Sequence, residues 1–160
     1  SGLPTRRFAF EAFLPMDKKE RREVLQELVD ETRTIIIYEA PHKLVKTLKD
    51  LKETLGNRRI TLCRELTKKH ETAFRTTIDQ LIAYYENEKP LGECVLVIEG
   101  KSRQELKKEA EASWEEISIE EHMEIYESKG LSRKDAMKQV AKDRGVNKRE
   151  IYQYLVNGEK

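Results

Sequence analysis

Two unbroken hydrophobic runs mark the strongest strands that the sequence predicts. Thr34–Tyr38 and Cys94–Ile98 are rich in β-branched and aliphatic residues, and neither run alternates with polar residues. Continuous hydrophobicity is typical of central strands that are covered on both faces. Further strands are expected at Phe8–Phe13 and Arg59–Arg64, with a short edge strand near Thr72–Thr76.

Helical periodicity lies between these strands. Residues Pro41–Leu55 place their aliphatic side chains on one stripe, begin with a proline suited to a first helical turn, and stop before Gly56. Helices are also expected at Lys18–Val29 and Ile78–Tyr85. Strands that alternate with helices predict an α/β layered domain over residues 1–100.

The rest of the chain has a different pattern. Residues 101–130 are acidic and rich in helix formers, so we expect a helical linker that ends at Gly130. Residues 131–160 predict two short helices, capped by Ser132 and Asn147 and joined by a turn at Gly145. Helix, short glycine-containing turn and helix together indicate a small helix-turn-helix-like unit.

Charge separates these regions more clearly than the overall composition does. The net charge is +1, which by itself does not indicate a nucleic-acid-binding protein. Residues 1–100 carry 18 Lys and Arg against 17 Asp and Glu, residues 101–130 carry 5 against 9, and residues 131–160 carry 8 against 4. The basic surplus therefore lies in the predicted helix-turn-helix-like unit.

Cysteine usage and hydrophobicity indicate the cellular compartment. Cys63 and Cys94 lie in predicted strands and have neither a disulfide-framework nor a metal-ligand spacing, which favours a reducing cytoplasm. No hydrophobic run approaches the roughly 18 residues of a membrane span. We expect a cytoplasmic protein with no metal and no membrane partner. The chain begins at Ser1 without Met, so we also expect it to be part of a longer protein.

Three charged segments follow or precede predicted strands, where ligands of open α/β sheets gather. Tyr38–Lys43 offers Glu39 and His42 beside a helix N-terminus. The alternative is that Glu39 only interacts favourably with the helix dipole and that His42 is an exposed first-turn residue. Arg64–Glu71 is a dense charge cluster that suits phosphate binding, and its alternative is a solvated loop. Gly92-Glu93 either lets a ligand approach the backbone or forms an ordinary turn.

Five segments in chain order carry a resemblance to a known family. They are Ser1–Thr5, Phe8–Pro15, Tyr38–Lys43, Arg64–Lys68 and Gly92–Gly100. Together they resemble the ribosomal RNA small subunit methyltransferase I family of the tetrapyrrole methylase superfamily, also called class III methyltransferases. The basic tail after Gly130 resembles that family's small C-terminal helical region more loosely.

The resemblance implies a two-domain enzyme of which this chain is the C-terminal part. The implied fold is a mixed sheet of about five strands flanked by helices, with a small helix-turn-helix-like appendage. The implied activity is S-adenosylmethionine-dependent methylation of the 2′-hydroxyl of a cytidine in small-subunit (16S) ribosomal RNA. The missing domain would carry the glycine-rich cofactor loop, so this fragment alone is expected to be inactive. Homodimers are common among such proteins, and we expect one here.

The resemblance also implies site residues. The cofactor cleft would be lined by Gly2, Leu3, Pro4, Thr5, Tyr38, Glu39, Ala40, Leu66, Thr67, Gly92 and Glu93. A ribose hydroxyl is a poor nucleophile, so a general base is expected, with Glu39, His42 and Glu65 as candidates unless the missing domain supplies it. RNA phosphates would meet Lys43, Arg64, Lys68 and Lys69. By their charge alone, Lys134, Lys138, Lys142, Lys148 and Arg149 would add phosphate contacts, and the alternative for them is a solvated basic face.

Two residues depart from the family pattern. Lys43 stands where Arg is common, which removes a bidentate phosphate contact because Lys acts as a point charge. Ala12 stands where Gly is common, and we expect this change to affect only local packing.

Three other functions remain as alternatives. One is a methylase of tetrapyrrole or corrin precursors, another is a non-enzymatic RNA-binding module, and the third is a DNA-binding regulator built on the helix-turn-helix pattern. The basic tail speaks against the first. The hydrophobic and aromatic end of the last helix suggests packing rather than groove reading, which speaks against the third.

Overall fold

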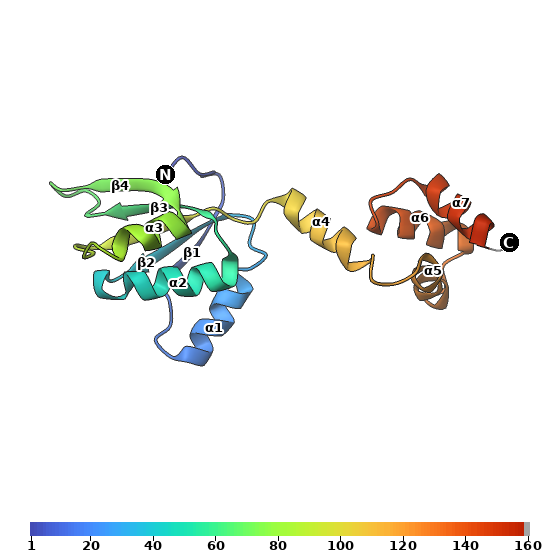
Figure 1. Ribbon diagram of the computed structural model, residues 1–160, viewed down its shortest axis with the longest axis horizontal. Coiled ribbons are helices and arrows are strands. Elements are labelled where there is room, and N and C mark those ends of the chain that lie inside the picture. The colour runs from blue at the N-terminus through green and yellow to red at the C-terminus, as the bar shows by residue number, and fades with distance from the viewer. Residues whose placement is uncertain (159–160) are drawn as a thin grey trace. The chain divides into compact units, whose positions relative to one another are not determined.

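The computed structural model describes residues 1–158 and divides the chain into two compact units, Ser1–Ser102 and Arg103–Lys160. The elements are β1 (Phe8–Phe13), α1 (Lys18–Glu27), β2 (Thr34–Glu39), η1 (Pro41–Lys43), α2 (Leu44–Leu55), β3 (Arg59–Arg64), β4 (Thr72–Thr77), α3 (Ile78–Tyr85), β5 (Cys94–Ile98), α4 (Arg103–Ser113), α5 (Ile119–Ser128), α6 (Arg133–Asp143) and α7 (Lys148–Gly158) (Figure 1). Across the described residues, no helix is both long and hydrophobic enough to cross a membrane.

The first unit is built on one mixed sheet with the strand order β1-β2-β5-β3-β4. β1 pairs parallel with β2, and all other pairs are antiparallel. The α/β class and the five-stranded mixed sheet are therefore confirmed. β4 is an edge strand, as predicted for the short segment near Thr72–Thr76.

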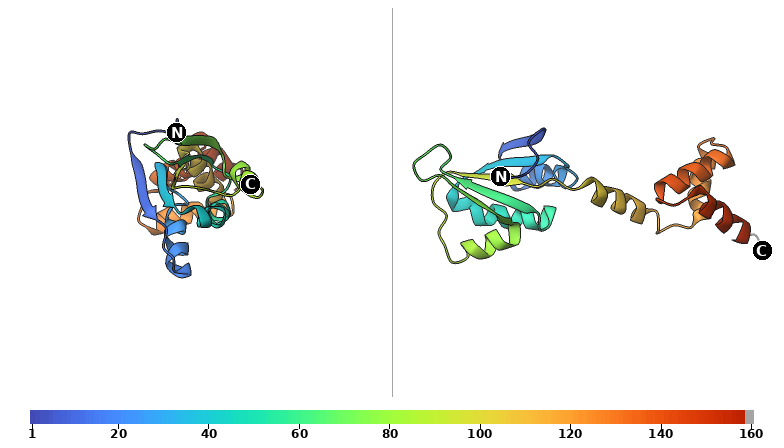
Figure 2. Two further views of the ribbon diagram at one scale, coloured as in Figure 1. Left: turned by 90° about the vertical axis from the view of Figure 1, so that its left-hand side faces the viewer. Right: turned by 90° about the horizontal axis from the view of Figure 1, so that it is seen from above.

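Helices α1, α2 and α3 all lie on one face of this sheet (Figures 1 and 2). The strand residues that face the helices are buried. In β2 and β5 they are each 0% exposed: Ile35, Ile37, Leu96 and Ile98. Their neighbours Ile36, Val95 and Val97 are only half-buried. The expectation that these strands are covered on both faces is therefore wrong, because the opposite face, called the open face below, has no helix over it.

A β-bulge in β1 shows why Ala12 matters. The register with β2 shifts between Phe10 and Ala12, and Ala12 has a φ of 50°. A left-handed backbone conformation strains any residue with a Cβ and favours glycine. Alanine in place of glycine at position 12 thus strains the backbone. The prediction that this change affects only local packing is therefore incomplete.

The second unit has its own hydrophobic core. Helices α5, α6 and α7 surround Met123, Ala136, Val140, Ala141, Ile151 and Leu155. The predicted caps form: the Ser132 hydroxyl accepts from Asp135 N, and Asn147 Oδ1 accepts from Arg149 N. Residues 101–130, expected to be a linker, contribute α5 to this core through His122 and Met123.

A buried polar network supports this core. His122 is 0% exposed and stacks on Trp114 with ring centroids 3.9 Å apart. Its Nδ1 accepts a hydrogen bond of 3.2 Å from Arg144 Nε, and its Nε2 lies 3.3 Å from Asp143 Oδ2. Burial and the Arg144 charge lower the pKa of His122, outweighing Asp143, so the ring is a neutral hydrogen-bonding group rather than half of an ion pair.

Candidate functional site

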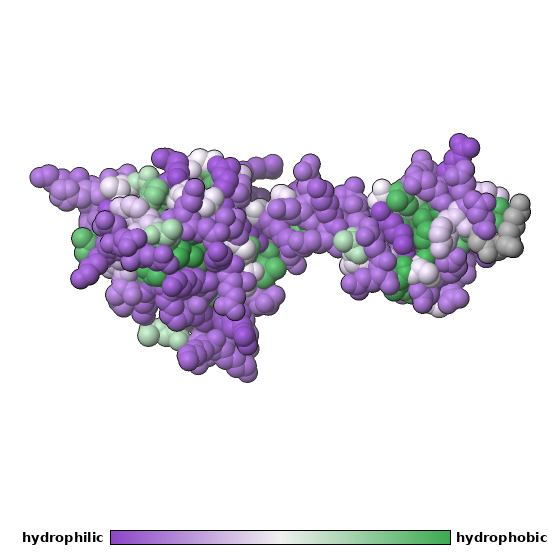
Figure 3. Space-filling view, viewed as in Figure 1, coloured by the Kyte–Doolittle hydropathy of each residue, from purple (hydrophilic) through white to green (hydrophobic). Residues whose placement is uncertain are grey.

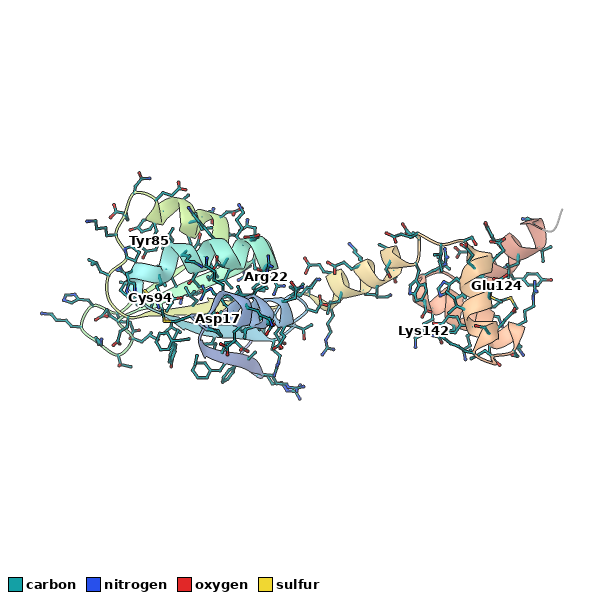
Figure 4. The ribbon with its side chains drawn as sticks, turned by 90° about the horizontal axis from the view of Figure 1, so that it is seen from below. Asp17, Arg22, Tyr85, Cys94, Glu124 and Lys142 are labelled. Carbon is teal, nitrogen blue, oxygen red and sulfur yellow. The ribbon has the colours of Figure 1, made fainter. Side chains whose placement is uncertain are left out.

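Three strand ends meet at one end of the sheet. Glu39, the last residue of β2, and Arg64, the last of β3, both stand opposite Cys94, the first of β5. The segments that follow residues 39 and 64 and precede residue 94 therefore lie side by side, as expected for a site at strand ends. Tyr85 of α3 and Cys94 lie at this same end (Figure 4). We call the segments Tyr38–Lys43, Arg64–Glu71 and Gly92–Cys94 together the strand-end cluster.

Glu39 points toward the helices and is 6% exposed. Its Oε2 accepts from the Thr47 hydroxyl at 2.5 Å, and its Oε1 accepts from Ala40 N at 2.8 Å. Arg21 Nη2 donates to the same Thr47 hydroxyl at 2.8 Å. Both carboxylate oxygens of Glu39 are thus engaged, and the contacts join the end of β2 to α2.

Tyr38, one residue earlier, points toward the open face. Its ring lies 5.1 Å from that of Phe10 and 5.8 Å from that of Phe13, both in edge-to-face geometry. Tyr38 is 39% exposed, while Phe10 and Phe13 are 52% and 63% exposed. The strand-end cluster therefore carries an aromatic surface on one side and the buried Glu39 contacts on the other.

His42 and Lys43 lie in the short 3₁₀ helix η1 that follows β2. His42 is exposed, and no hydrogen bond or ion pair of its side chain is found within residues 1–158. Lys43 is half-buried, with its Nζ 3.3 Å from Met16 Sδ. Of the three base candidates, His42 is exposed, whereas Glu65 is half-buried and Glu39 is buried.

Glu65 joins the two loops of the strand-end cluster. Its N–H donates to Glu93 O at 3.1 Å, and its Oε1 accepts from Glu93 N at 2.7 Å. The hydrogen bond from Glu93 N, together with nearby Lys68, lowers the pKa of Glu65, so this carboxylate stays ionised. Lys68 Nζ lies 3.0 Å from Glu93 Oε2 and 3.5 Å from Glu65 Oε2.

Gly92 provides the space in which Glu65 lies. Its φ is 76°, and a Cβ at this position would lie 2.7 Å from Glu65 Cγ. The close approach that glycine permits here is therefore made by a side chain of the same unit. Leu66 and Thr67, further along the loop, are exposed, and Thr67 has a φ of 65°.

Two more cations lie at and just beyond the end of β3. Arg64 is half-buried and donates from Nε to the Thr72 hydroxyl at 3.2 Å. Lys69 is exposed in the loop. Of the first unit's predicted RNA contacts, Lys43, Arg64 and Lys68 thus have partners within the fold.

Gly2–Thr5 lies away from the strand-end cluster. Pro4 O accepts from the Thr34 hydroxyl at 2.7 Å, and Thr34 begins the strand that Glu39 ends, about 17 Å away at strand geometry. Ser1 O accepts from the Thr61 hydroxyl at 3.3 Å. Residues 2–5 therefore run along the opposite end of β2 and β3, and the structure does not bring them to the other cofactor candidates.

A pocket of about 320 Å³ lies beside this N-terminal segment, lined by residues that include Ser1, Leu3, Arg59, Thr61 and Arg75. The sequence reasoning missed it. To predict this pocket from the sequence, one would have to know that Thr61 pairs with Arg75 across β3 and β4, and the sequence does not give that strand register.

The predicted RNA contacts of the second unit are arranged differently. Lys134, Lys138 and Lys142 recur every four residues along α6, so they share one exposed face, which we call the lysine row. Lys148 is half-buried and Arg149 exposed at the start of α7. Within residues 1–158, none of these five side chains has a hydrogen-bond or ion-pair partner.

Comparison with known proteins identifies relatives of the chain. A family model described as Tetrapyrrole (Corrin/Porphyrin) Methylases matches residues 2–82. Proteins named Ribosomal RNA small subunit methyltransferase I are similar along nearly the whole chain. The protein of Halalkalibacterium halodurans and that of Bacillus subtilis are each 44% identical over 152 residues, covering 95% of this chain and 52% of the relative. The Synechocystis protein is 42% identical over 154 residues, covering 96% and 53%.

The chain spans about half the length of these curated relatives. Among solved structures, a cobalt precorrin-4 methyltransferase of cobalamin biosynthesis matches 58% of this chain and 40% of its own, with 20% identity and a TM-score of 0.42. A likeness of that size supports no conclusion about function.

Proposed function

Because the chain belongs to the tetrapyrrole methylase family, we propose that it is part of a methyltransferase acting on the 2′-hydroxyl of a cytidine in small-subunit (16S) ribosomal RNA, with S-adenosylmethionine as methyl donor. One observation carries this proposal. The chain is 44% identical, over 95% of its length, to two proteins named Ribosomal RNA small subunit methyltransferase I. Since it spans half of them, activity is expected only of the whole enzyme.

The strand-end cluster suits one wall of a nucleoside-binding cleft. Tyr38 and Leu66 are 39% and 41% exposed, and both offer hydrophobic surface to a base or to the adenosine part of the cofactor. Ala40 lies two residues after Tyr38, and Thr67 directly follows Leu66. When bound, S-adenosylmethionine supplies an electrophilic methyl carbon. The residues of this wall would then hold the ribose oxygen in line with that methyl carbon. Positioning of this kind can account for much of an enzyme's rate enhancement.

Gly92 and Glu93 complete the wall indirectly, because they hold Glu65 and Lys68 in place. Gly2, Leu3, Pro4 and Thr5 lie at the other end of β2, so they belong to the same cleft only if the bound molecule extends along the open face.

Among the base candidates, accessibility favours His42. A general base must reach the proton it removes. The Glu39 carboxylate is buried and engaged on both oxygens, and the Glu65 carboxylate binds Glu93 N. We propose that Glu39 and Glu65 position the loops and that His42 faces the substrate, unless the other half of the enzyme supplies the base.

This assignment is tested in the whole enzyme with His42→Ala and His42→Gln. A base role predicts a large loss of kcat in both variants and loss of the pH-dependent limb of kcat at unchanged substrate KM. If both variants keep wild-type kcat and its pH profile, the base lies elsewhere.

The proposed activity is tested by transfer of a labelled methyl group to purified, unmethylated small ribosomal subunits. The whole enzyme and this chain are assayed side by side, and the labelled position is mapped. Labelling of a cytidine ribose by the whole enzyme alone supports the proposal. Labelling of a tetrapyrrole precursor, with none of the RNA, would keep the family and overturn the substrate. Sedimentation of the whole enzyme tests the expected homodimer.

A further inference from the structure

The last helix leaves an unusual stripe of side chains in solvent. α7 buries Ile151 and Leu155, which are 2% and 9% exposed. Arg149, Tyr152, Gln153 and Val156 are all exposed, and their spacing of three, four and seven residues places them along one side of the helix. Tyr152 is 57% exposed and Val156 is 44% exposed. We call these four residues the α7 stripe.

The α7 stripe has the composition of a contact surface. A helix on the outside of a small unit normally turns charged and polar residues to water, and large exposed hydrophobic groups mark interaction sites when they cluster. Within the described residues, the Tyr152 ring has no aromatic, cationic or hydrogen-bonding partner. Figure 3 shows hydrophobic surface among hydrophilic surface on this unit.

The neighbouring charges indicate what covers the stripe. The lysine row ends at Lys142 and the stripe begins at Arg149, so both border the turn between α6 and α7. None of these cations is paired within residues 1–158. Residues 131–160 carry 8 Lys and Arg against 4 Asp and Glu, so a second copy of the same surface would be repelled. The surface fits a partner that is anionic and also has flat apolar faces.

Single-stranded nucleic acid has both properties. Its phosphates bind unpaired Lys and Arg, and its unstacked bases stack on exposed aromatic rings. Duplex RNA fits less well, because its deep, narrow major groove does not admit a helix.

We propose that the α7 stripe is a stacking surface for an unpaired base of RNA, centred on Tyr152, with the lysine row contacting the flanking phosphates. This inference rests on the proposed function only in taking RNA as the nucleic acid. It adds that the helical unit selects single-stranded over double-stranded RNA.

The chain contains a matched control for the aromatic contact. Tyr154 is also exposed, at 48%, but at about 100° per residue it lies about 160° around the helix from Tyr152. Tyr152→Ala and Tyr154→Ala therefore remove the same side chain from opposite sides of one helix. Both residues lie outside the core of the unit, and Tyr152→Phe keeps the ring while removing the hydroxyl.

The experiment measures fluorescence anisotropy of a labelled single-stranded 12-nucleotide RNA with the 160-residue chain, beside the same RNA annealed to its complement. We expect Tyr152→Ala to weaken single-strand binding about tenfold, Tyr152→Phe to keep it, and Tyr154→Ala to change it by less than about twofold. Because stacking is not an ionic contact, the Tyr152→Ala ratio should persist as salt is raised, while the effect of a Lys138→Gln variant shrinks.

Three outcomes would overturn the inference. Equal losses from Tyr152→Ala and Tyr154→Ala would show nonspecific loosening of the helix, which circular dichroism checks directly. A Tyr152-dependent preference for the annealed duplex over the single strand would make the unit a reader of double-stranded nucleic acid. A dimer that dissociates on Tyr152→Ala would assign the stripe to a second copy. The methyl-transfer assay of the whole enzyme is independent of these results. RNA binding by the chain, with no methylation of ribosomal RNA by the whole enzyme, would overturn the proposed function and leave this inference standing.

Discussion

The strand-end cluster and the second unit both carry cations predicted to contact RNA, but the two regions use charge differently. In the strand-end cluster, Lys68 Nζ lies 3.0 Å from Glu93 Oε2 and 3.5 Å from Glu65 Oε2. In the second unit, the lysine row has no partner within residues 1–158. Cations paired with nearby carboxylates hold loops together, whereas unpaired cations are free to neutralise phosphates at little cost.

The largest expected effect tests this difference directly. Replacing the lysine row, as Lys134→Gln, Lys138→Gln and Lys142→Gln together, should weaken RNA binding about 30-fold at low salt and reduce the salt slope by about 2. The matched change Lys68→Gln should leave the slope nearly unchanged, because that cation already has protein partners. Anisotropy titrations over a range of salt concentrations measure both. A larger slope change for Lys68→Gln would reverse the comparison.

A smaller effect is expected from opening the strand-end cluster without touching a charge. Gly92→Ala forces a Cβ into the space of the Glu65 side chain at a φ of 76°. We expect the first unit to lose about 1.5 kcal/mol of unfolding free energy, from strain and the displaced contact to Glu93 N. Chemical denaturation, monitored by amide exchange of the sheet residues, measures this loss of unfolding free energy. Gly56→Ala is the matched control, because its φ is also positive but its Cβ would meet nothing within 4 Å. Equal losses in the two variants would mean that backbone strain alone acts.

The sequence predicted the elements well because their signals are local. Hydrophobic runs marked β2 and β5, periodicity marked α2, and Ser132 and Asn147 marked caps. It failed where the answer depends on what lies across the sheet. A hydrophobic run such as Ile35–Ile37 can occur in a strand covered on one face or on both. Only the placement of all three helices on one side of the sheet shows that one face of β2 is covered by helices.

The site was predicted in part for the same reason. Strand ends near one another follow from topology, so Glu39, Arg64 and Glu93 were expected together. The partners of each side chain do not follow from topology. That Glu39 binds Thr47, that Glu65 binds Glu93, and that Gly2–Thr5 lies at the other end of β2 depend on three-dimensional packing alone.

A still smaller effect is expected at the bulge of β1. Ala12→Gly relieves a φ of 50° and should stabilise the first unit by about 1 kcal/mol, less the larger backbone entropy that glycine has in the unfolded chain. The second unit should be unaffected, since the units have separate cores. Thermal denaturation of the variant beside wild type measures the gain. A destabilised variant would show that the Ala12 methyl packs well enough to outweigh its backbone strain.

The smallest effect separates the two units by pH. Burial lowers the pKa of His122 below its ordinary value of about 6.5, so the unfolded chain takes up a proton there before the folded unit does. The stability from this group is therefore complete above pH about 6.5 and is lost as pH falls toward the lower folded pKa. In the first unit, the hydrogen bond from Arg33 lowers the pKa of Glu31 to about 2, so that group's contribution is lost only below its ordinary value of 4.5. Between pH 7 and 5, the second unit should weaken first.

Trp114 makes this difference measurable, because it is the only tryptophan and stacks on His122. Its fluorescence reports the second unit, while amide exchange of the sheet reports the first. The Trp114 melting midpoint should fall between pH 7 and 5 while the sheet is unchanged, and His122→Gln should remove that fall. The groups that face His122 are Tyr126 on its own helix and Asp143 and Arg144 at the end of α6. If His122→Gln keeps the same pH dependence, the pH response does not come from His122, and the buried ring is a packing element.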